Sequence, residues 1–404
     1  MTASAVGQHA PPYTQTTSTA PERFGSRIAS LDVVRGAVMV LMAIDHVRVF
    51  AGVPAGGPTS GVFFTRWVTH FCAPAFIFLA GSAAYLYGQK VESRRALAKF
   101  LLTRGLWLVL LELTVLRLGW TFNFDYANFT FAGVIWAIGW SMVLLAGLVY
   151  LPTAAVAAIG LAIIVGHNAL APLVYGVEQP SWILRVLYAG EGFQIPGLGW
   201  NVAILYTLIP WVGVMAAGYG FGAIMRMEPE RRRRPCLAIG GGAIALFLLL
   251  RATGVYGDPR TWQSQEGVPA VLAFINASKY PASLLFLLMT LGPAILALPF
   301  LENARGQVAR WLSVFGQVPF FYYVLHIPLI HVAAVLISLV RTPAHTGWLV
   351  ANHPLMPPDV PPDYRWSLAL LYLVTALVVL GLYYPCRWYA KKKAERRSAW
   401  MSFL

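Results

Sequence analysis

Long apolar runs bounded by charged residues constrain the fold of this chain more than any other feature. Segments such as LAIGGGAIALFLLL (237–250) and LALLYLVTALVVLGL (368–382) contain no charged residue. Over the whole chain 58% of residues are hydrophobic and 11% are charged, against about 25% charged in a typical soluble domain. About 20 apolar helical residues cross a bilayer, whereas membrane β-barrels alternate apolar and polar residues. We therefore predict an all-α polytopic membrane protein.

Apolar windows of roughly 20 residues predict about ten transmembrane helices. These windows lie at 29–50, 63–88, 99–120, 130–150, 152–170, 201–225, 236–256, 278–300, 311–339 and 366–390. With ten spans, the basic clusters, among them RRRR at 231–234 and KKKAERR at 391–397, fall on one side together with both termini. By the positive-inside rule that side is cytoplasmic. The formal net charge of +14 is then mainly a topology signal, and we expect no nucleic-acid partner.

The chain divides into one membrane domain and two tails. Residues 1–26 are polar and rich in Thr, Ala and Pro, which predicts a disordered cytoplasmic tail, not a signal peptide. Residues 27–390 form the transmembrane domain, and residues 391–404 a basic cytoplasmic tail. The three cysteines lie in or beside apolar runs without CxxC spacing, so we interpret them as core residues.

Two of the connections predicted on the opposite side are long. Residues 171–200 include an aromatic, amphipathic stretch that suits the membrane interface. Residues 341–365 are rich in proline and carry His345 and His353. We interpret this second segment as a lid, with a plain connecting loop as the simpler alternative.

The first predicted helix carries ionisable residues that are costly inside a membrane, which favours a functional role for them. Asp32, Arg35, Met39, Met42 and His46 follow helical spacing and share one face. Asp32 and Arg35 are one turn apart and can neutralise each other. Arg35 and His46 are separated by about 16 Å along the axis, too far for contact.

His46 and His70 are candidate catalytic residues. Both are predicted near the outer side, at the ends of helices joined by a short Gly- and Pro-containing loop, and Asp45 adjoins His46. Imidazole titrates near neutral pH, which suits general acid–base catalysis. Two histidines without a further ligand make a poor zinc site, so no metal is expected. The simpler interpretation is a buried histidine bonded to a backbone carbonyl.

Three further residues are candidates for substrate binding. Asn276 and Lys279 are predicted at the outer mouth of the eighth helix, where a lysine also snorkels without any function. His326 falls near mid-membrane in the ninth helix, where core packing is the alternative.

Five stretches together resemble a known family. LDVVRG…DH, THFCAPAFIFLAG, YTLIPWVGVMAAGYGFG, KYPASLLFLLMTLGP and FGQVPFFYYVLHIPL resemble the bacterial DUF1624 family, which is related to the catalytic domain of heparan-α-glucosaminide N-acetyltransferase. The resemblance runs from Arg27 through the ninth predicted helix. In addition, Arg35 and His46 are similar to the Arg-x10-His feature of acyltransferase-3 proteins.

The resemblance implies an inner-membrane acyltransferase that moves an acetyl or other acyl group from cytosolic acyl-CoA to a sugar-type acceptor across the membrane. Acetyl-CoA would be a co-substrate, and no tightly bound cofactor is expected. The lysosomal relative is thought to use a histidine in the loop after the first helix, but this chain has none between His46 and His70. A homo-oligomer is compatible with the sequence.

The implied roles follow the geometry of the first helix. Asp32 and Arg35 would hold the donor, and His46, oriented by Asp45, would take a proton from the acceptor. The remaining candidates would polarise the thioester or contact the acceptor: His70, Asn276, Lys279 and His326.

Two other classes of function stay open. A transporter or flippase also combines about ten helices with intramembrane Asp, Arg and His, although no inverted repeat is visible. An acyltransferase relative that has become a sensor or scaffold is the third option. Turnover of a CoA thioester separates the enzyme from both.

Overall fold

The computed structural model describes residues 28–56, 59–263, 269–352 and 360–395. The predicted tail at 1–26 lies outside these residues. The first half of the chain contains α1 Ala29–Phe50, α2 Ser60–Trp67, η1 Val68–Phe71, α3 Cys72–Gly88, α4 Arg94–Leu111, η2 Glu112–Leu116, α5 Arg117–Thr121, β1 Thr130–Ala132, α6 Val134–Leu148, α7 Thr153–Gly166, η3 His167–Leu170, α8 Ala171–Tyr175, α9 Trp182–Leu184, η4 Arg185–Ala189, β2 Glu191–Gln194 and β3 Asn201–Ile204. The second half contains α10 Leu208–Met225, α11 Pro229–Thr253, α12 Ala270–Ile275, α13 Leu284–Leu301, α14 Gln307–Gln317, α15 Pro319–Arg341, η5 Pro343–His345, α16 Thr346–Leu349 and α17 Leu368–Glu395.

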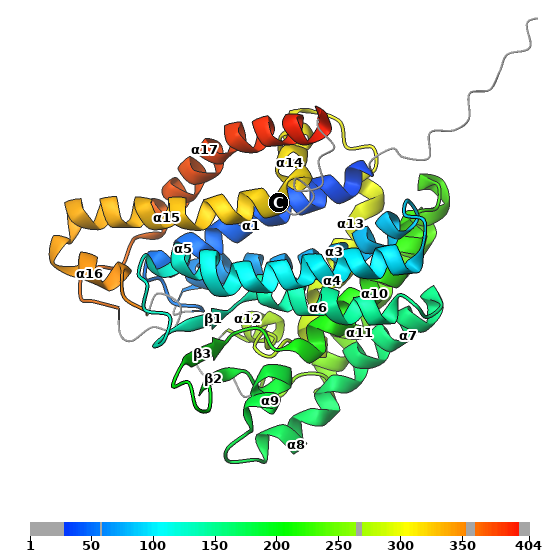
Figure 1. The fold of residues 1–404 in the computed structure, drawn as a ribbon, viewed down its shortest axis with the longest axis horizontal. Coiled ribbons are helices and arrows are strands. Elements are labelled where there is room, and N and C mark those ends of the chain that lie inside the picture. The colour runs from blue at the N-terminus through cyan, green and yellow to red at the C-terminus, as the bar shows by residue number, and fades with distance from the viewer. Residues whose placement is uncertain (1–27, 57–58, 264–268, 353–359, 396–404) are drawn as a thin grey trace, which may run out of the picture.

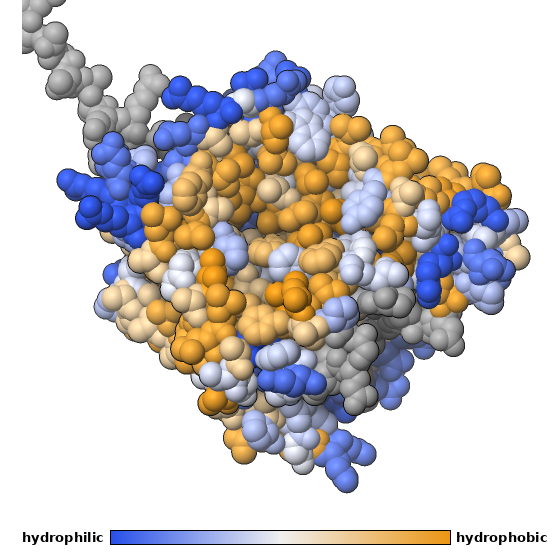
Figure 2. All heavy atoms as spheres, turned by 180° about the vertical axis from the view of Figure 1, so that it is seen from behind, coloured by the Kyte–Doolittle hydropathy of each residue, from blue (hydrophilic) through white to orange (hydrophobic). Residues whose placement is uncertain are grey.

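The helices form a bundle with an apolar exterior. Seven helical stretches in the described ranges are long and apolar enough to cross a membrane: Ser60–Gly88, Thr153–Tyr175, Leu208–Met225, Pro229–Thr253, Leu284–Leu301, Pro319–Arg341 and Leu368–Glu395. α1 has 22 residues but carries four charged side chains. Figure 2 shows a broad hydrophobic face with hydrophilic surface gathered toward its margins. Such a surface suits contact with lipid, and the chain is an integral membrane protein of the all-α class.

The basic helix ends lie at one end of the bundle (Figure 1). Arg226, after α10, donates to Gln89 in the α3–α4 connection at 2.7 Å. Glu302, after α13, pairs with Arg232 of α11 and accepts from Ser30 of α1 at 3.2 Å. These contacts bring the start of α1 and three connections together, as the one-sided basic clusters predict. α17 continues to Glu395, so the first residues of the predicted C-terminal tail are helical.

Three differences from the predicted windows concern the kind or number of elements. The ninth window, 311–339, holds two helices, because α14 ends at Gln317 and Pro319, which lacks a backbone N–H, begins α15. The windows 130–150 and 201–225 each begin with a short strand, β1 and β3. Three or four apolar residues carry too little periodicity to separate a strand from the start of a helix.

These strands belong to a small sheet of order β1-β3-β2 (Figure 1). β1 pairs with β3 in parallel, with Phe131 opposite Ala203, and β2 pairs with β3 antiparallel. β1 immediately precedes α6, so the sheet fixes where α6 begins. It thereby places Phe131 and Val134 beside the end of α1.

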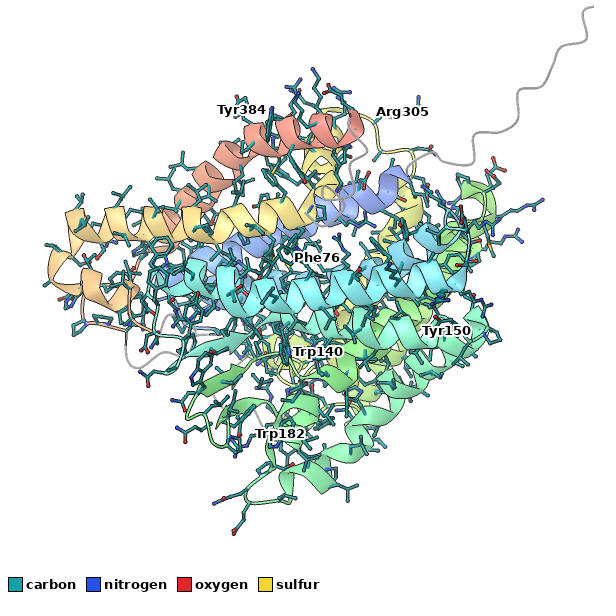
Figure 3. All side chains as sticks on the ribbon, viewed as in Figure 1. Phe76, Trp140, Tyr150, Trp182, Arg305 and Tyr384 are labelled. Atoms are coloured by element: carbon teal, nitrogen blue, oxygen red, sulfur yellow. The ribbon has the colours of Figure 1, made fainter. Side chains whose placement is uncertain are left out.

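α1 lies inside the bundle, packed against α3, α13, α14, α15 and α17. Its approach to α14 depends on two glycines: a methyl group at Gly36 would overlap the carbonyl oxygen of Leu312, and one at Gly316 would overlap that of Asp32. Small residues allow such close approach of membrane helices. Figure 3 shows Phe76 of α3 within the bundle and Tyr384 of α17 on the outside.

Candidate active site

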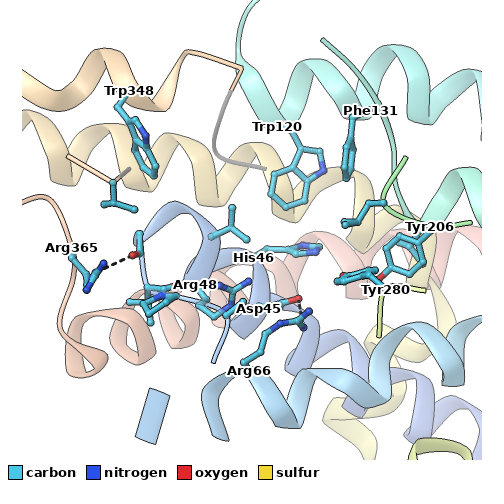
Figure 4. A pocket seen from close by; sticks show the side chains of 18 of the residues that line it. Asp45, His46, Arg48, Arg66, Trp120, Phe131, Tyr206, Tyr280, Trp348 and Arg365 are labelled. Carbon is cyan, nitrogen blue, oxygen red and sulfur yellow. Dashed lines mark hydrogen bonds and ion pairs between the residues drawn. The ribbon is translucent and has the colours of Figure 1, made fainter. Parts of the chain in front are cut away.

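A cavity of about 480 Å³ lies at the C-terminal end of α1 (Figure 4). We call it the His46 cavity. Its wall combines charged and aromatic side chains, a mixture typical of sites for polar ligands. The charged or titratable group comprises Asp45, His46, Arg48, Arg66 and Arg365, and the aromatic group comprises Trp120, Phe131, Tyr206, Tyr280, Tyr323 and Trp348.

The segment before α17 fixes the end of α1. The Tyr364 hydroxyl donates to the carbonyl of Phe50 at 2.6 Å, and the Trp366 amide donates to that of Ala51 at 3.0 Å. Gly52 then adopts a left-handed conformation, φ +67°, which glycine accepts without a Cβ penalty just after a helix. Arg365 donates to the Gly52 carbonyl at 3.2 Å. The chain therefore turns sharply beside His46 and forms one wall of the cavity.

A network behind the wall ties the α5–β1 connection to the predicted lid. Arg117 is fully buried and donates to the carbonyls of Phe129, at 2.8 Å, and Asp125, at 2.7 Å. The Asn352 amide donates to the Asp125 carboxylate at 2.9 Å, and this hydrogen bond lowers the pKa of Asp125. The lid segment, which carries Trp348, is thus anchored. The predicted lid residue His353 lies outside the described residues.

His46 contacts a second histidine. Its Nδ1 lies 2.6 Å from Nε2 of His326 on α15. Nδ1 of His326 lies 2.7 Å from the carbonyl oxygen of Tyr323 and 3.2 Å from that of Tyr322. The His46 ring also meets Trp120 edge to face, with ring centres 4.8 Å apart. Three rings, those of Trp120, Tyr323 and His326, therefore hold His46 in one orientation.

Asp45 is held by two arginines. Its Oδ1 lies 2.9 Å from Nε of Arg48, and its Oδ2 lies 3.3 Å from Nη1 of Arg66. All three side chains are at most 15% exposed. Lys279 adds another buried positive charge, with its Nζ 5.2 Å from the ring centre of Tyr280. Positive charge therefore exceeds negative charge around the His46 cavity.

A second cavity, of about 660 Å³, lies between α1, α3, α4, α6, α15 and α17, and we call it the Arg35 cavity. Its wall is mostly apolar, and four basic residues contribute to it: Arg35, Lys90, Arg104 and Lys393. Nη1 of Arg35 lies 3.5 Å from Oδ1 of Asp32, the pairing expected for residues one turn apart. Tyr323 and Val134 line both cavities, so they stand between them.

The structure brings some predicted site residues together and separates others. Asp45 and His46 line one cavity and Arg35 the other, whereas His326 lies directly behind His46. The ring of His70 packs against Phe286, with centres 5.3 Å apart, and His70 does not line the His46 cavity. Lys279 adjoins the lining residue Tyr280, but neither Lys279 nor Asn276 belongs to the described lining of the cavity.

Sequence reasoning missed several lining residues, above all Arg66, Tyr206 and Tyr280. Arg66 carried a usable signal, because it is charged and falls inside the apolar window 63–88. The two tyrosines carried no signal as single residues, although both stand in stretches that resemble the family, YTLIPWVGVMAAGYGFG and KYPASLLFLLMTLGP. Within the described residues, no group of three or more His, Cys, Asp or Glu side chains is arranged to hold a metal ion.

Comparison with known proteins gives a family. No curated protein matches the chain at a significant level. The family model described as heparan-alpha-glucosaminide N-acetyltransferase, catalytic, matches residues 27–251, a little over half of the chain. The match begins just before α1 and includes Arg35, Asp45, His46 and Arg66. With its apolar helices, the family match indicates a membrane acyltransferase, and the chain belongs to the heparan-alpha-glucosaminide N-acetyltransferase catalytic family.

Proposed function

We propose that this protein transfers an acyl group, in the first instance acetyl, from cytosolic acyl-CoA to a hydroxyl or amine of a sugar-type acceptor on the opposite side of an inner (plasma) membrane. The observation that carries the proposal is the pair of cavities toward opposite ends of α1 that share Val134 and Tyr323 in their walls. A donor in one and an acceptor in the other would meet at that shared wall.

The Arg35 cavity suits the donor. The phosphates of CoA are anionic, and Arg35, Lys90, Arg104 and Lys393 supply positive charge at the same end of the bundle as the basic connections. By the positive-inside rule this end is cytoplasmic. The apolar remainder of the cavity suits the pantetheine arm, which has to cover about 16 Å between the levels of Arg35 and His46. The ion pair with Asp32 fixes the direction of Arg35.

The His46 cavity suits the acceptor. The aromatic faces of Trp120, Tyr206 and Tyr280 offer flat apolar surfaces, and Arg48 and Arg66 offer hydrogen-bond donors. A few polar groups set among aromatic walls is the usual composition of a small-molecule site. We assign the acceptor contacts to these lining groups, with Lys279 as a nearby charge, and leave His70 and Asn276 outside the reaction.

The reaction needs one base. His46 takes the proton from the acceptor hydroxyl or amine as that atom attacks the thioester carbonyl. The bond from the acceptor to the carbonyl carbon forms and the carbon–sulfur bond breaks. The proton held by His46 then passes to the departing CoA thiolate, which returns the histidine to its neutral form. General base catalysis of this kind contributes about 10²–10⁴-fold to the rate.

The test is release of CoA thiol from acetyl-CoA by detergent-purified protein, in which water replaces the unidentified acceptor. We expect His46→Ala to lower the release rate by about 100-fold or more while acetyl-CoA binding stays unchanged. His345→Ala is the matched control, because His345 does not line the His46 cavity. Wild-type protein that neither binds acetyl-CoA nor releases thiol would refute the proposal and favour the transport alternative.

A further inference from the structure

We infer that His326 is a positioning residue that holds His46 in the tautomer with a bare Nε2, the nitrogen that accepts the proton. The inference rests on the proposed role of His46 as the base. It concerns the hydrogen bond between the two rings, in which Nδ1 of His46 lies 2.6 Å from Nε2 of His326, a residue 280 positions later in the chain.

One proton lies between the two nitrogens. At 2.6 Å, two lone pairs would repel each other, and two N–H groups would bring their hydrogens into collision. Nδ1 of His46 and Nε2 of His326 therefore share a single hydrogen. The protonation of the other nitrogen of His326, Nδ1, determines to which ring this hydrogen is covalently bonded.

Nδ1 of His326 must carry a hydrogen. Its two neighbours are the carbonyl oxygens of Tyr323 and Tyr322, and carbonyl oxygens only accept. The His326 side chain is fully buried, and its hydrogen bonds among the described residues go to His46, Tyr322 and Tyr323, so no carboxylate would stabilise a cationic ring there. A neutral imidazole has one N–H, so Nε2 of His326 holds a lone pair.

The consequence falls on His46. Its Nδ1 carries the shared hydrogen and donates a hydrogen bond to Nε2 of His326, so in the neutral ring Nε2 of His46 carries no hydrogen. His46 lines the cavity, and Figure 4 shows its ring extending toward Tyr280 and Tyr206. The base is therefore prepared on the side where the acceptor would bind, before any substrate arrives.

Asp45 does not fill this orienting role. Both of its carboxylate oxygens are engaged by Arg48 and Arg66, and its hydrogen bonds among the described residues go to these two arginines. The adjacent carboxylate still favours the cationic form of His46 that exists between proton uptake and proton return. During that interval Nδ1 keeps donating to His326, so the ring does not turn.

The experiment compares two substitutions of His326 in the full-length protein in detergent. His326→Gln places an amide oxygen near the position of Nε2 and keeps an acceptor for His46. His326→Leu fills a similar space without an acceptor. Both are assayed for acetyl-CoA thiol release, separating kcat from KM. The control is His331→Leu, which removes another fully buried histidine of α15, one that contacts Gly119, Phe50 and Phe122.

We expect His326→Leu to lower kcat at least tenfold with KM for acetyl-CoA unchanged, and His326→Gln to recover most of that loss. In serine-protease triads, a wrong tautomer costs about 10⁴-fold in kcat. Equal loss in both variants with intact acetyl-CoA binding, or no loss in either, overturns the inference. If His46→Ala retains full turnover as well, the proposed function itself fails, so the two failures are distinguishable. A third outcome also overturns the inference: His326→Leu loses acetyl-CoA binding, while His326→Gln keeps the wild-type kcat and KM. His326 would then be a packing residue.

Discussion

Removing the Asp45 carboxylate should destabilise the protein strongly. The carboxylate lies 2.9 Å from Arg48 and 3.3 Å from Arg66, and all three side chains are at most 15% exposed. Asp45→Ala therefore leaves two nearly buried guanidinium groups without their shared anion. Breaking a buried pair by removing one partner costs about 3–5 kcal/mol. With 404 residues and an unfolding entropy of roughly 2 cal/mol/K per residue, this lowers the melting temperature by about 4–6 °C.

The assay is thermal unfolding in detergent, with two comparisons. Adding Arg66→Met to Asp45→Ala removes one of the two unpaired charges. The melting temperature of the double variant should therefore fall by less than the sum of the decreases in the two single variants. Glu395→Gln is the control, because it breaks ion pairs with exposed lysines that contribute about 1 kcal/mol at most. Asp45→Ala with a wild-type melting temperature, or additive losses in the double variant, would refute the reasoning.

Three further predictions concern packing, the shared wall and the donor cavity. Gly36→Ala should lower the free energy of unfolding by about 1–3 kcal/mol, because the new methyl group overlaps the backbone of α14. Gly147→Ala places its methyl group in open space and should leave the free energy of unfolding almost unchanged. Thermal unfolding compares the two variants. Tyr323→Ala should join the two cavities and admit water, so thioester hydrolysis rises relative to transfer once an acceptor is found, and an unchanged ratio would argue against a dividing wall. Arg104→Gln should raise KM for acetyl-CoA about fivefold with kcat unchanged, which corresponds to a loss of about 1 kcal/mol of binding free energy. Arg310 lies outside the cavity lining, so Arg310→Gln should leave KM unchanged. Equal KM values in the two variants would remove Arg104 from the donor site.

The sequence predicted the features that depend on local chemistry. Ionisable residues are costly in a membrane, and this cost first drew attention to Arg35, Asp45 and His46, which the structure places in the walls of the two cavities. Helical spacing also predicted the Asp32–Arg35 ion pair. The one-sided basic clusters predicted that several distant connections meet at one end of the bundle.

Features that depend on tertiary packing could not be predicted from the sequence. The partner of His46 is His326, on a helix that follows after most of the chain, and no local pattern announces that contact. The apposition of α1 and α14 at Gly36 is likewise visible only once both helices are in place. The break before Pro319 was signalled by the proline itself, but the surrounding apolar run concealed it.

The measurement that tests the central claim most directly follows both halves of the donor across a membrane. Proteoliposomes containing the protein receive external acetyl-CoA labelled separately on the acetyl group and on the adenine, with amino sugars inside. We predict that acetyl label accumulates inside, as acetylated sugar or acetate, while adenine label stays outside, and that His46→Ala abolishes the accumulation. Joint entry of both labels as intact acetyl-CoA would contradict the account and identify a carrier. Exclusion of both labels, with no thiol released, would contradict it as well.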